Sequence, residues 1–146
     1  MLGLIAYLVN PAWMAWAAVP LPDWLRWAGA GIGCAATVLI AWTLHHLGRN
    51  LTDTIVTRQR HTLVTTGPYR WVRHPFYSSV VLAALASALM AANAGLLITG
   101  GLLFLLMVIR TRKEEANLLA RFGDDYRQHM RRTGRFLPRW PCDWVV

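Results

Sequence analysis

The sequence has no charged residue in three long stretches, residues 1–19, 27–47 and 75–109. Acidic residues are scarce throughout, with 7 in a chain of 146 that is 55% hydrophobic. A soluble domain mixes its apolar residues with polar ones, whereas uncharged runs of about 20 residues are typical of helices that span a bilayer. These absences exclude an ordinary soluble protein, and the length fits one domain.

Cysteine is also scarce. Cys34 falls inside an uncharged run and Cys142 in the polar tail, so we expect no disulfide between them. The chain has no Cys-x-x-Cys motif, which removes the support for a zinc-ribbon or redox site. The spacing of four of its histidines matches no zinc motif, so we expect no metal site. These histidines are His45, His46, His61 and His74.

The pattern predicts an all-α, polytopic integral membrane protein that forms a single membrane-embedded domain over residues 1–146. Four transmembrane helices are expected at about residues 1–19, 24–47, 76–92 and 96–109. A signal peptide is the alternative for the first of these, but the basic n-region is missing. Asp23 can cap the second helix, and Asn93-Ala94-Gly95 can turn the chain between the last two.

Two further features concern the packing and the end of the chain. Gly29 and Gly33 form a Gly-x-x-x-Gly pair, which favours close helix packing in a membrane. From residue 110 onward the chain is charged and amphipathic, and we predict a cytoplasmic helical segment with a break near Gly123. Its apolar residues recur at helical spacing: Leu118, Leu119, Phe122, Tyr126 and Met130.

The 15 basic residues are distributed unevenly. Five lie in residues 48–74 and nine from residue 110 onward, which leaves only Arg26 elsewhere. Four spans with both termini in the cytoplasm place those fourteen on the inner side, as the positive-inside rule requires. The high arginine and alanine content and the short chain further indicate a prokaryotic protein, so we expect a prokaryotic inner (plasma) membrane protein. A nucleic-acid binder needs no such alternation, so we expect no nucleic-acid partner.

The hairpin of the last two spans brings two charged segments to the same membrane face. Residues 61–77 read HTLVTTGPYRWVRHPFY, and residues 110–119 read RTRKEEANLL. Together they offer arginines to an anion, Glu114 and Glu115 to an ammonium group, and aromatic rings to a flat or cationic group. S-adenosyl-L-methionine has all of these features, although the arginines would also suit a nucleotide phosphate.

The two segments resemble the isoprenylcysteine carboxyl methyltransferase family of integral membrane enzymes and, more distantly, membrane phospholipid N-methyltransferases. Residues 122–138, FGDDYRQHMRRTGRFLP, also resemble the family's tail, so the likeness covers about residues 47–138. It implies that residues 48–75 and 110–138 form a cytoplasmic region that binds S-adenosyl-L-methionine. The implied cofactor-binding residues are His61, Leu63, Val64, Tyr69, His74, Pro75, Tyr77, Glu114 and Glu115.

The resemblance also assigns an acceptor side. It implies that Arg110, four residues before Glu114 on one helix face, meets the methyl acceptor as the catalytic residue. The family pattern Tyr-x-Gly is replaced here by Tyr77-Ser78-Ser79. An isolated Arg110–Glu114 pair could equally be an interfacial ion pair of little energetic weight.

We expect methyl transfer to a lipophilic acceptor that enters from the membrane lipid, most specifically carboxyl O-methylation of an isoprenoid or prenylated, prenylcysteine-like substrate. Three alternatives remain open from the sequence. They are phospholipid headgroup N-methylation, a non-catalytic module that binds anionic lipid through its arginines, and a membrane reductase. Nothing in the sequence indicates an oligomeric state.

Overall fold

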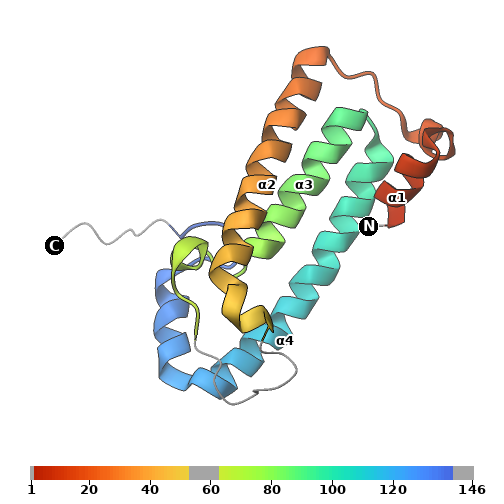
Figure 1. Cartoon of the computed structure of the whole chain (residues 1–146). Helices are drawn as coiled ribbons and strands as arrows, with labels where there is room; N and C mark the ends of the chain where they lie inside the picture. The colour runs from red at the N-terminus through yellow and green to blue at the C-terminus, as the bar shows by residue number, and fades with distance from the viewer. Residues whose placement is uncertain (1, 53–62, 140–146) are drawn as a thin grey trace. The chain divides into compact units, whose positions relative to one another are not determined.

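The computed structural model describes residues 2–52 and 63–139, and these residues contain helices and no strand. The predicted all-α class is therefore confirmed for this part of the chain. In order, the helices are α1 (Leu2–Val9), the 3-10 helix η1 (Pro11–Ala17), α2 (Asp23–Thr52), the 3-10 helix η2 (Gly67–Arg70), α3 (Pro75–Ala91) and α4 (Ala94–Arg132) (Figure 1).

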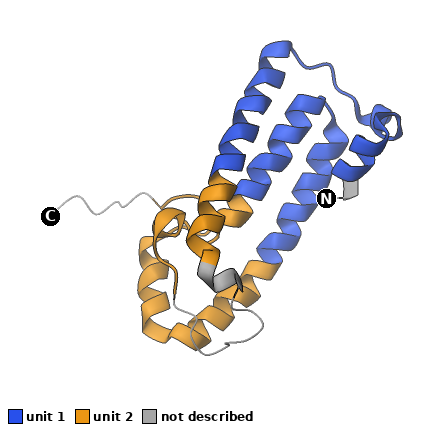
Figure 2. Cartoon of the chain, in the orientation of Figure 1, with its two compact units in different colours: residues 1–38, 79–109 blue, residues 39–78, 110–146 orange. Residues whose placement is uncertain are grey.

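The chain divides into two compact units (Figure 2). The first unit comprises residues 1–38 and 79–109, and the second comprises residues 39–78 and 110–146. The helices α2 and α4 each begin in the first unit and end in the second. All of the described candidate site residues belong to the second unit.

The expectation of a single spanning helix over residues 1–19 is wrong. The helix α1 ends at Val9, and Asn10 adopts an extended backbone with φ of −152°. Pro11 has no amide hydrogen to continue the helix, and the Asn10 side chain instead accepts a hydrogen bond from the amide of Ala12 at 3.0 Å. Eight residues of α-helix span about 12 Å, which is less than half of a bilayer core of about 30 Å.

The other three predicted helices are present: α2 and α3 have small shifts at their ends, and α4 includes the predicted residues 96–109 and extends beyond them. Two of them, α2 and α4, are long and apolar enough to cross a membrane, and α3 is a shorter apolar helix of 17 residues. Few residues of the apolar parts of α2 and α4 are buried in the protein, whereas a core helix of a soluble protein would be mostly buried. This exposure, together with the apolar sequence, is typical of helices that lie in a membrane rather than in the core of a soluble protein.

In the first unit, α2 packs closely on α3 at a glycine. A Cβ atom at Gly29 would lie 2.8 Å from Cβ of Leu89 and 3.1 Å from the backbone nitrogen of Met90. At Gly33 the nearest contact would be an ordinary 3.6 Å, to Ala86. The predicted close packing is therefore concentrated at the first glycine of the pair.

The predicted turn between the last two apolar helices is also present. Ala92 has a positive φ of 49°, and the chain reverses between α3 and α4. The side chain of Asn93 donates a 2.8 Å hydrogen bond to the carbonyl of Met14 and accepts one from the amide of Leu96. These bonds attach the segment after α1 to the hairpin turn.

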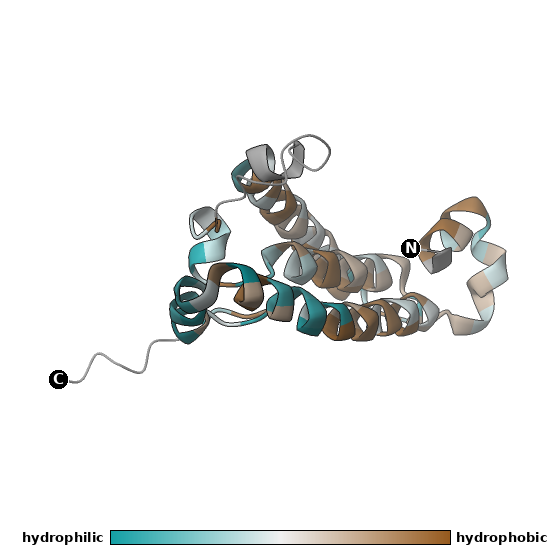
Figure 3. Cartoon of the chain, turned by 90° about the horizontal axis from the view of Figure 1, so that it is seen from below, coloured by the Kyte–Doolittle hydropathy of each residue, from teal (hydrophilic) through white to brown (hydrophobic). Residues whose placement is uncertain are grey.

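The helix α4 continues well past the uncharged residues 94–109, which we take as its membrane-spanning part. In Figure 3 the residues of α4 change from mostly hydrophobic to mostly hydrophilic along the helix. Gly123 interrupts the helical backbone with φ of 53° and ψ of −121°. A side chain at this position would be strained, so the predicted break near Gly123 is confirmed and has a backbone cause.

Candidate functional site

Most of the site residues predicted from the sequence lie close together in the second unit. The last part of α4 carries Arg110, Glu114 and Glu115, while the segment from residue 63 to the first turn of α3 carries the others. His61 lies outside the described residues. Pro75, the first residue of α3, is buried, as is Ser79, which stands where the family pattern has glycine.

The carboxylate of Glu114 is the meeting point of three predicted residues. Its Oε1 accepts a 2.7 Å hydrogen bond from the hydroxyl of Tyr77 and a 2.8 Å hydrogen bond from Nε of Arg110. Its Oε2 lies 3.8 Å from Nδ1 of His74. The Glu114 side chain keeps about a third of its surface exposed, and that of Arg110 keeps 74%. This carboxylate is therefore both oriented by the protein and accessible.

Glu115 has a different environment, although it is the next residue. Its side chain is 7% exposed, and it binds the guanidinium groups of Arg73, at 2.8 Å, and of Arg135. Burial raises the pKa of Glu115, and the hydrogen bonds from Arg135 and Arg73 outweigh that effect, so its pKa lies below the usual value. Glu115 is thus a buried carboxylate that both arginines keep ionised.

His74 lies between the two carboxylates and two aromatic rings. Its ring stacks on Tyr77 with centroids 5.6 Å apart and lies 6.0 Å from the ring of Phe136. Its Nε2 is 3.4 Å from Oε1 of Glu115 without the geometry of a hydrogen bond. Burial lowers the pKa of His74 despite the nearby Glu115 and Glu114 charges, so the ring is neutral near pH 7.

The residues after α4 close against this group. We call residues 133–137 the C-terminal strap. Its backbone exchanges hydrogen bonds with the segment before α3, from the amide of Arg73 to the carbonyl of Gly134 at 2.9 Å and from the amide of His74 to the carbonyl of Arg135 at 3.1 Å. The hydroxyl of Ser78 donates to the carbonyl of Phe136.

A mostly apolar cavity of about 310 Å³ lies in the same unit. This volume is at the lower end of the range for small-molecule sites. The predicted residues Leu63, Val64 and Tyr69 line it. Arg73 lines it too, and because Arg73 also binds Glu115, it connects the cavity to the carboxylate group. The remaining lining residues are Leu47, Leu118, Arg121, Phe122, Tyr126 and His129.

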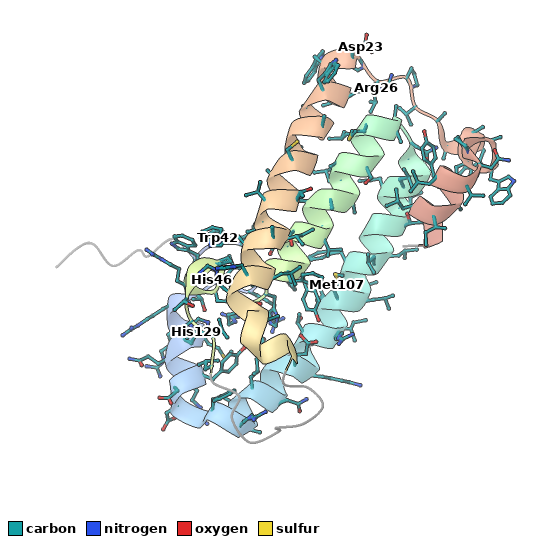
Figure 4. All side chains as sticks on the ribbon, viewed as in Figure 1. Asp23, Arg26, Trp42, His46, Met107 and His129 are labelled. Carbon is teal, nitrogen blue, oxygen red and sulfur yellow. The ribbon has the colours of Figure 1, made fainter. Side chains whose placement is uncertain are left out.

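Three titratable groups of the cavity are shifted by burial. Burial raises the pKa of Tyr69 to about 12, and burial, with a contribution from the Glu115 charge, raises that of Tyr126 to about 12. Burial and the nearby charge of Arg73 lower the pKa of His129, a residue labelled in Figure 4. The phenols are therefore protonated and the imidazole is neutral near pH 7, so all three can bind a neutral ring by contact or hydrogen bond.

A second hollow of about 510 Å³ is more polar and has Leu63 and His129 in common with the first. These two side chains therefore lie at the boundary between an apolar cavity and a polar one. The other residues that line the second hollow are Thr65, Arg70, Asp125, Gln128, Arg132 and Thr133.

The sequence prediction missed the contribution of α4 to the cavity. Leu118 and Phe122 follow Glu115 before the break at Gly123, Tyr126 comes after it, and all three line the cavity. Their helical spacing predicts the apolar side of an amphipathic helix, and it does not indicate that this side lines a cavity. The partners of Glu115, Arg73 and Arg135, could not be paired from spacing, since they lie 42 and 20 residues away.

Residues 29–120 match the model of the isoprenylcysteine carboxyl methyltransferase (ICMT) family. The chain is 40% identical over 73 residues to methanethiol S-methyltransferase of Mycobacterium tuberculosis, covering 50% of this chain and 29% of that protein. It is 34% identical over 82 residues to the cobalt-zinc-cadmium resistance protein CzcN of Cupriavidus metallidurans, covering 56% and 38%.

It is also 28% identical over 114 residues to protein-S-isoprenylcysteine O-methyltransferase of Schizosaccharomyces pombe, covering 76% of this chain and 48% of that protein. The chain thus spans less than half the length of these three relatives. The matched residues 29–120 include Tyr77, Arg110 and Glu114, and they end before the C-terminal strap.

Proposed function

Because the chain belongs to the isoprenylcysteine carboxyl methyltransferase family, we propose that it transfers a methyl group from S-adenosyl-L-methionine to a lipophilic acceptor. The single observation that carries this proposal is the carboxylate of Glu114, which Tyr77 and Arg110 orient at 2.7 and 2.8 Å. An accessible carboxylate held in this way is suited to an ammonium group.

The residues present fit the proposed cofactor. Glu114 suits its ammonium group, and the cavity of about 310 Å³ with Tyr69 and Tyr126 suits a flat purine ring. The exposed guanidinium of Arg121 at the cavity lining suits a carboxylate. When bound, S-adenosyl-L-methionine supplies an electrophilic methyl group on a positively charged sulfur.

The protein then has to align the acceptor with the methyl group of the cofactor and to exclude water, and it does not have to transfer a proton. An ionised carboxylate acceptor already carries the electron pair that it donates, so it needs no general base. Arg110, exposed and four residues from Glu114, would orient that anion by a charge-assisted hydrogen bond. The neutral His74 stacked on Tyr77 keeps the ring system in place without adding a positive charge beside a cationic cofactor.

We propose carboxyl O-methylation of an isoprenoid or prenylcysteine-like acid as the reaction, in line with the relatives named as isoprenylcysteine O-methyltransferases. A second acceptor class, a thiol, is favoured by the likeness to methanethiol S-methyltransferase. Phospholipid N-methylation differs from carboxyl methylation because an ammonium acceptor must first lose a proton, as a thiol acceptor must also do.

We also propose that the whole chain is one membrane-embedded domain in a prokaryotic plasma membrane. In this arrangement α2, α3 and residues 94–109 cross the bilayer, and the basic segments that contain the site face the cytoplasm. A fourth crossing would have to come from residues before α2. The helix α1 in that region has eight residues and is too short to cross the bilayer alone. A cytoplasmic N-terminus therefore stays a prediction.

The test is a binding and methylation assay on the purified protein in detergent or nanodiscs. We expect saturable binding of S-adenosyl-L-methionine, weakened at least about tenfold by Glu114→Ala or His74→Ala. Asp124→Ala is the matched control, since Asp124 is an exposed acidic residue of the same helix. Wild-type protein that binds no cofactor would refute the proposal.

The labelled methyl group identifies the acceptor. The panel should contain a prenylcysteine, a free isoprenoid acid, a small thiol and phosphatidylethanolamine in vesicles. A base-labile methyl ester supports carboxyl methylation, a thioether supports the thiol class, and methylated ethanolamine lipid supports the phospholipid alternative.

A further inference from the structure

The C-terminal strap, residues 133–137, is attached to the site by more than its backbone. Arg73 donates from Nη1 to the carbonyls of Thr133, at 2.5 Å, and Met130, at 3.2 Å. The amide of Gly134 donates to the carbonyl of Trp71 at 3.1 Å. One arginine of the segment before α3 therefore holds both the end of α4 and the beginning of the strap.

Glu115 joins the two sides. It accepts from Nε of Arg73 at 2.8 Å on one side and from Arg135 of the strap on the other. A carboxylate that is 7% exposed requires such partners, and breaking a buried pair leaves an uncompensated charge. The strap is consequently fastened by an ionic contact that one substitution can remove.

The strap reaches the residues that we assign to the cofactor. It places the ring of Phe136 6.0 Å from the ring of His74, whose stacking partner at 5.6 Å is Tyr77. Tyr77 in turn orients Glu114. Opening the strap would expose His74 to water and release one side of the stack that aligns Tyr77.

We propose that Glu115, Arg73 and Arg135 form a clamp that keeps the C-terminal strap closed over His74, and that Glu115 and Arg135 are positioning residues of the cofactor site. Glu115 thus acts through the strap and not through the direct ligand contact that the sequence resemblance implies. The role of the strap in ligand binding rests on the proposed function, whereas the clamp itself is a property of the protein. The strap lies beyond the residues matched by the family model.

The test compares Glu115→Gln and Arg135→Gln with the matched control Arg127→Gln, an exposed arginine whose ion pair is with Asp124. Hydrogen–deuterium exchange follows peptides that contain the amides of Arg73, His74 and Gly134, which the strap protects. If the strap opens in these variants, exchange at these amides should become at least about tenfold faster. The exchange rates of peptides from α3 and from the uncharged part of α4 should stay unchanged. Arg127→Gln should behave as wild type.

Cofactor binding supplies the second measurement. We expect the dissociation constant for S-adenosyl-L-methionine to rise at least about tenfold in both variants, with kcat at saturating cofactor within about threefold of wild type. Arg135→Lys keeps the charge and should recover part of both effects. The Arg135 side chain is about one third exposed, so Arg135→Gln carries the test if Glu115→Gln fails to fold.

The outcomes separate the two proposals. Unchanged exchange of the strap peptides in Arg135→Gln overturns the clamp. Faster exchange with unchanged cofactor affinity overturns the positioning role. If the wild-type protein binds no S-adenosyl-L-methionine, the proposed function fails, and faster exchange in Arg135→Gln still supports the clamp.

Discussion

The hydroxyl of Tyr77 donates a 2.7 Å hydrogen bond to Oε1 of Glu114, a residue 37 positions later in the chain. The two residues belong to the first turn of α3 and the charged part of α4, and the uncharged hairpin between these positions brings them together. The same oxygen accepts from Arg110. A residue assigned to the acceptor and a residue assigned to the cofactor thus meet at one carboxylate.

Removing the charge of Glu114 should weaken cofactor binding specifically. Glu114→Gln keeps the size of the side chain and its ability to accept from Tyr77, so the fold should be retained. Loss of a charge-assisted contact to an ammonium group should raise the dissociation constant for S-adenosyl-L-methionine about tenfold or more. Isothermal titration calorimetry checks this, with Asp124→Asn as the control; equal affinity in Glu114→Gln and wild type would contradict the assignment.

Arg110 should act on the acceptor rather than on the cofactor. Its side chain is 74% exposed, so Arg110→Gln should cause little loss of stability. We expect the KM for the acceptor to rise at least about tenfold, while the affinity for S-adenosyl-L-methionine changes less than about threefold because Tyr77 still donates to Glu114. Arg112→Gln, two residues away and also exposed, is the control. A larger effect on cofactor affinity than on acceptor KM would reverse the assignment.

The contact of α2 with α3 predicts opposite effects for two neighbouring glycines. A Cβ at Gly29 would meet Leu89 and Met90 at 2.8 and 3.1 Å, so Gly29→Ala should cost about 1–3 kcal/mol of stability. A Cβ at Gly31 has nothing within 4 Å, so Gly31→Ala should be neutral or stabilising by up to about 1 kcal/mol. Thermal unfolding in detergent measures both, and a Gly31→Ala loss as large as that of Gly29→Ala would show that the packing argument is wrong.

Three of the predicted helices and the hairpin turn could be derived from the sequence because their signals are local. Uncharged runs, the turn at residues 93–95 and the glycine at position 123 each act within a few residues. The first helix could not be derived in the same way. Asn10-Pro11 is compatible with a kink inside one continuous helix, but in the structure α1 ends at Val9 and Asn10 caps the 3-10 helix η1.

The part of the site that the hairpin of α3 and α4 determines could be predicted from the sequence. That topology places Arg110 and Glu114 opposite Tyr77, and the structure shows these contacts. The hairpin topology does not predict the contact of Arg135 with Glu115, because the strap folds back only after the break at Gly123. Glu114 and Glu115 are equivalent in the sequence. In the structure Glu115 is buried between two arginines, whereas Glu114 is partly exposed.

The neutral state of His74 predicts a stability that falls with acid. Burial lowers its folded-state pKa below the usual 6.5, even though Glu115 and Glu114 raise it and Arg73 adds a smaller lowering effect. Below about pH 6.5 the unfolded chain therefore binds a proton that the folded protein does not, and stability is lost as the pH falls through the folded-state pKa. His129, whose pKa burial also lowers, contributes in the same direction.

Thermal unfolding in detergent at several values between about pH 8 and pH 5 measures this dependence. We expect a constant midpoint at the upper end and a decline that begins near pH 6.5 in the wild type. His74→Gln should flatten part of the decline, and the double variant His74→Gln/His129→Gln should flatten more of it. The exposed His45 of the same unit supplies the control, His45→Gln. If the single and double variants decline in parallel with wild type, the buried imidazoles are not the source of the acid sensitivity.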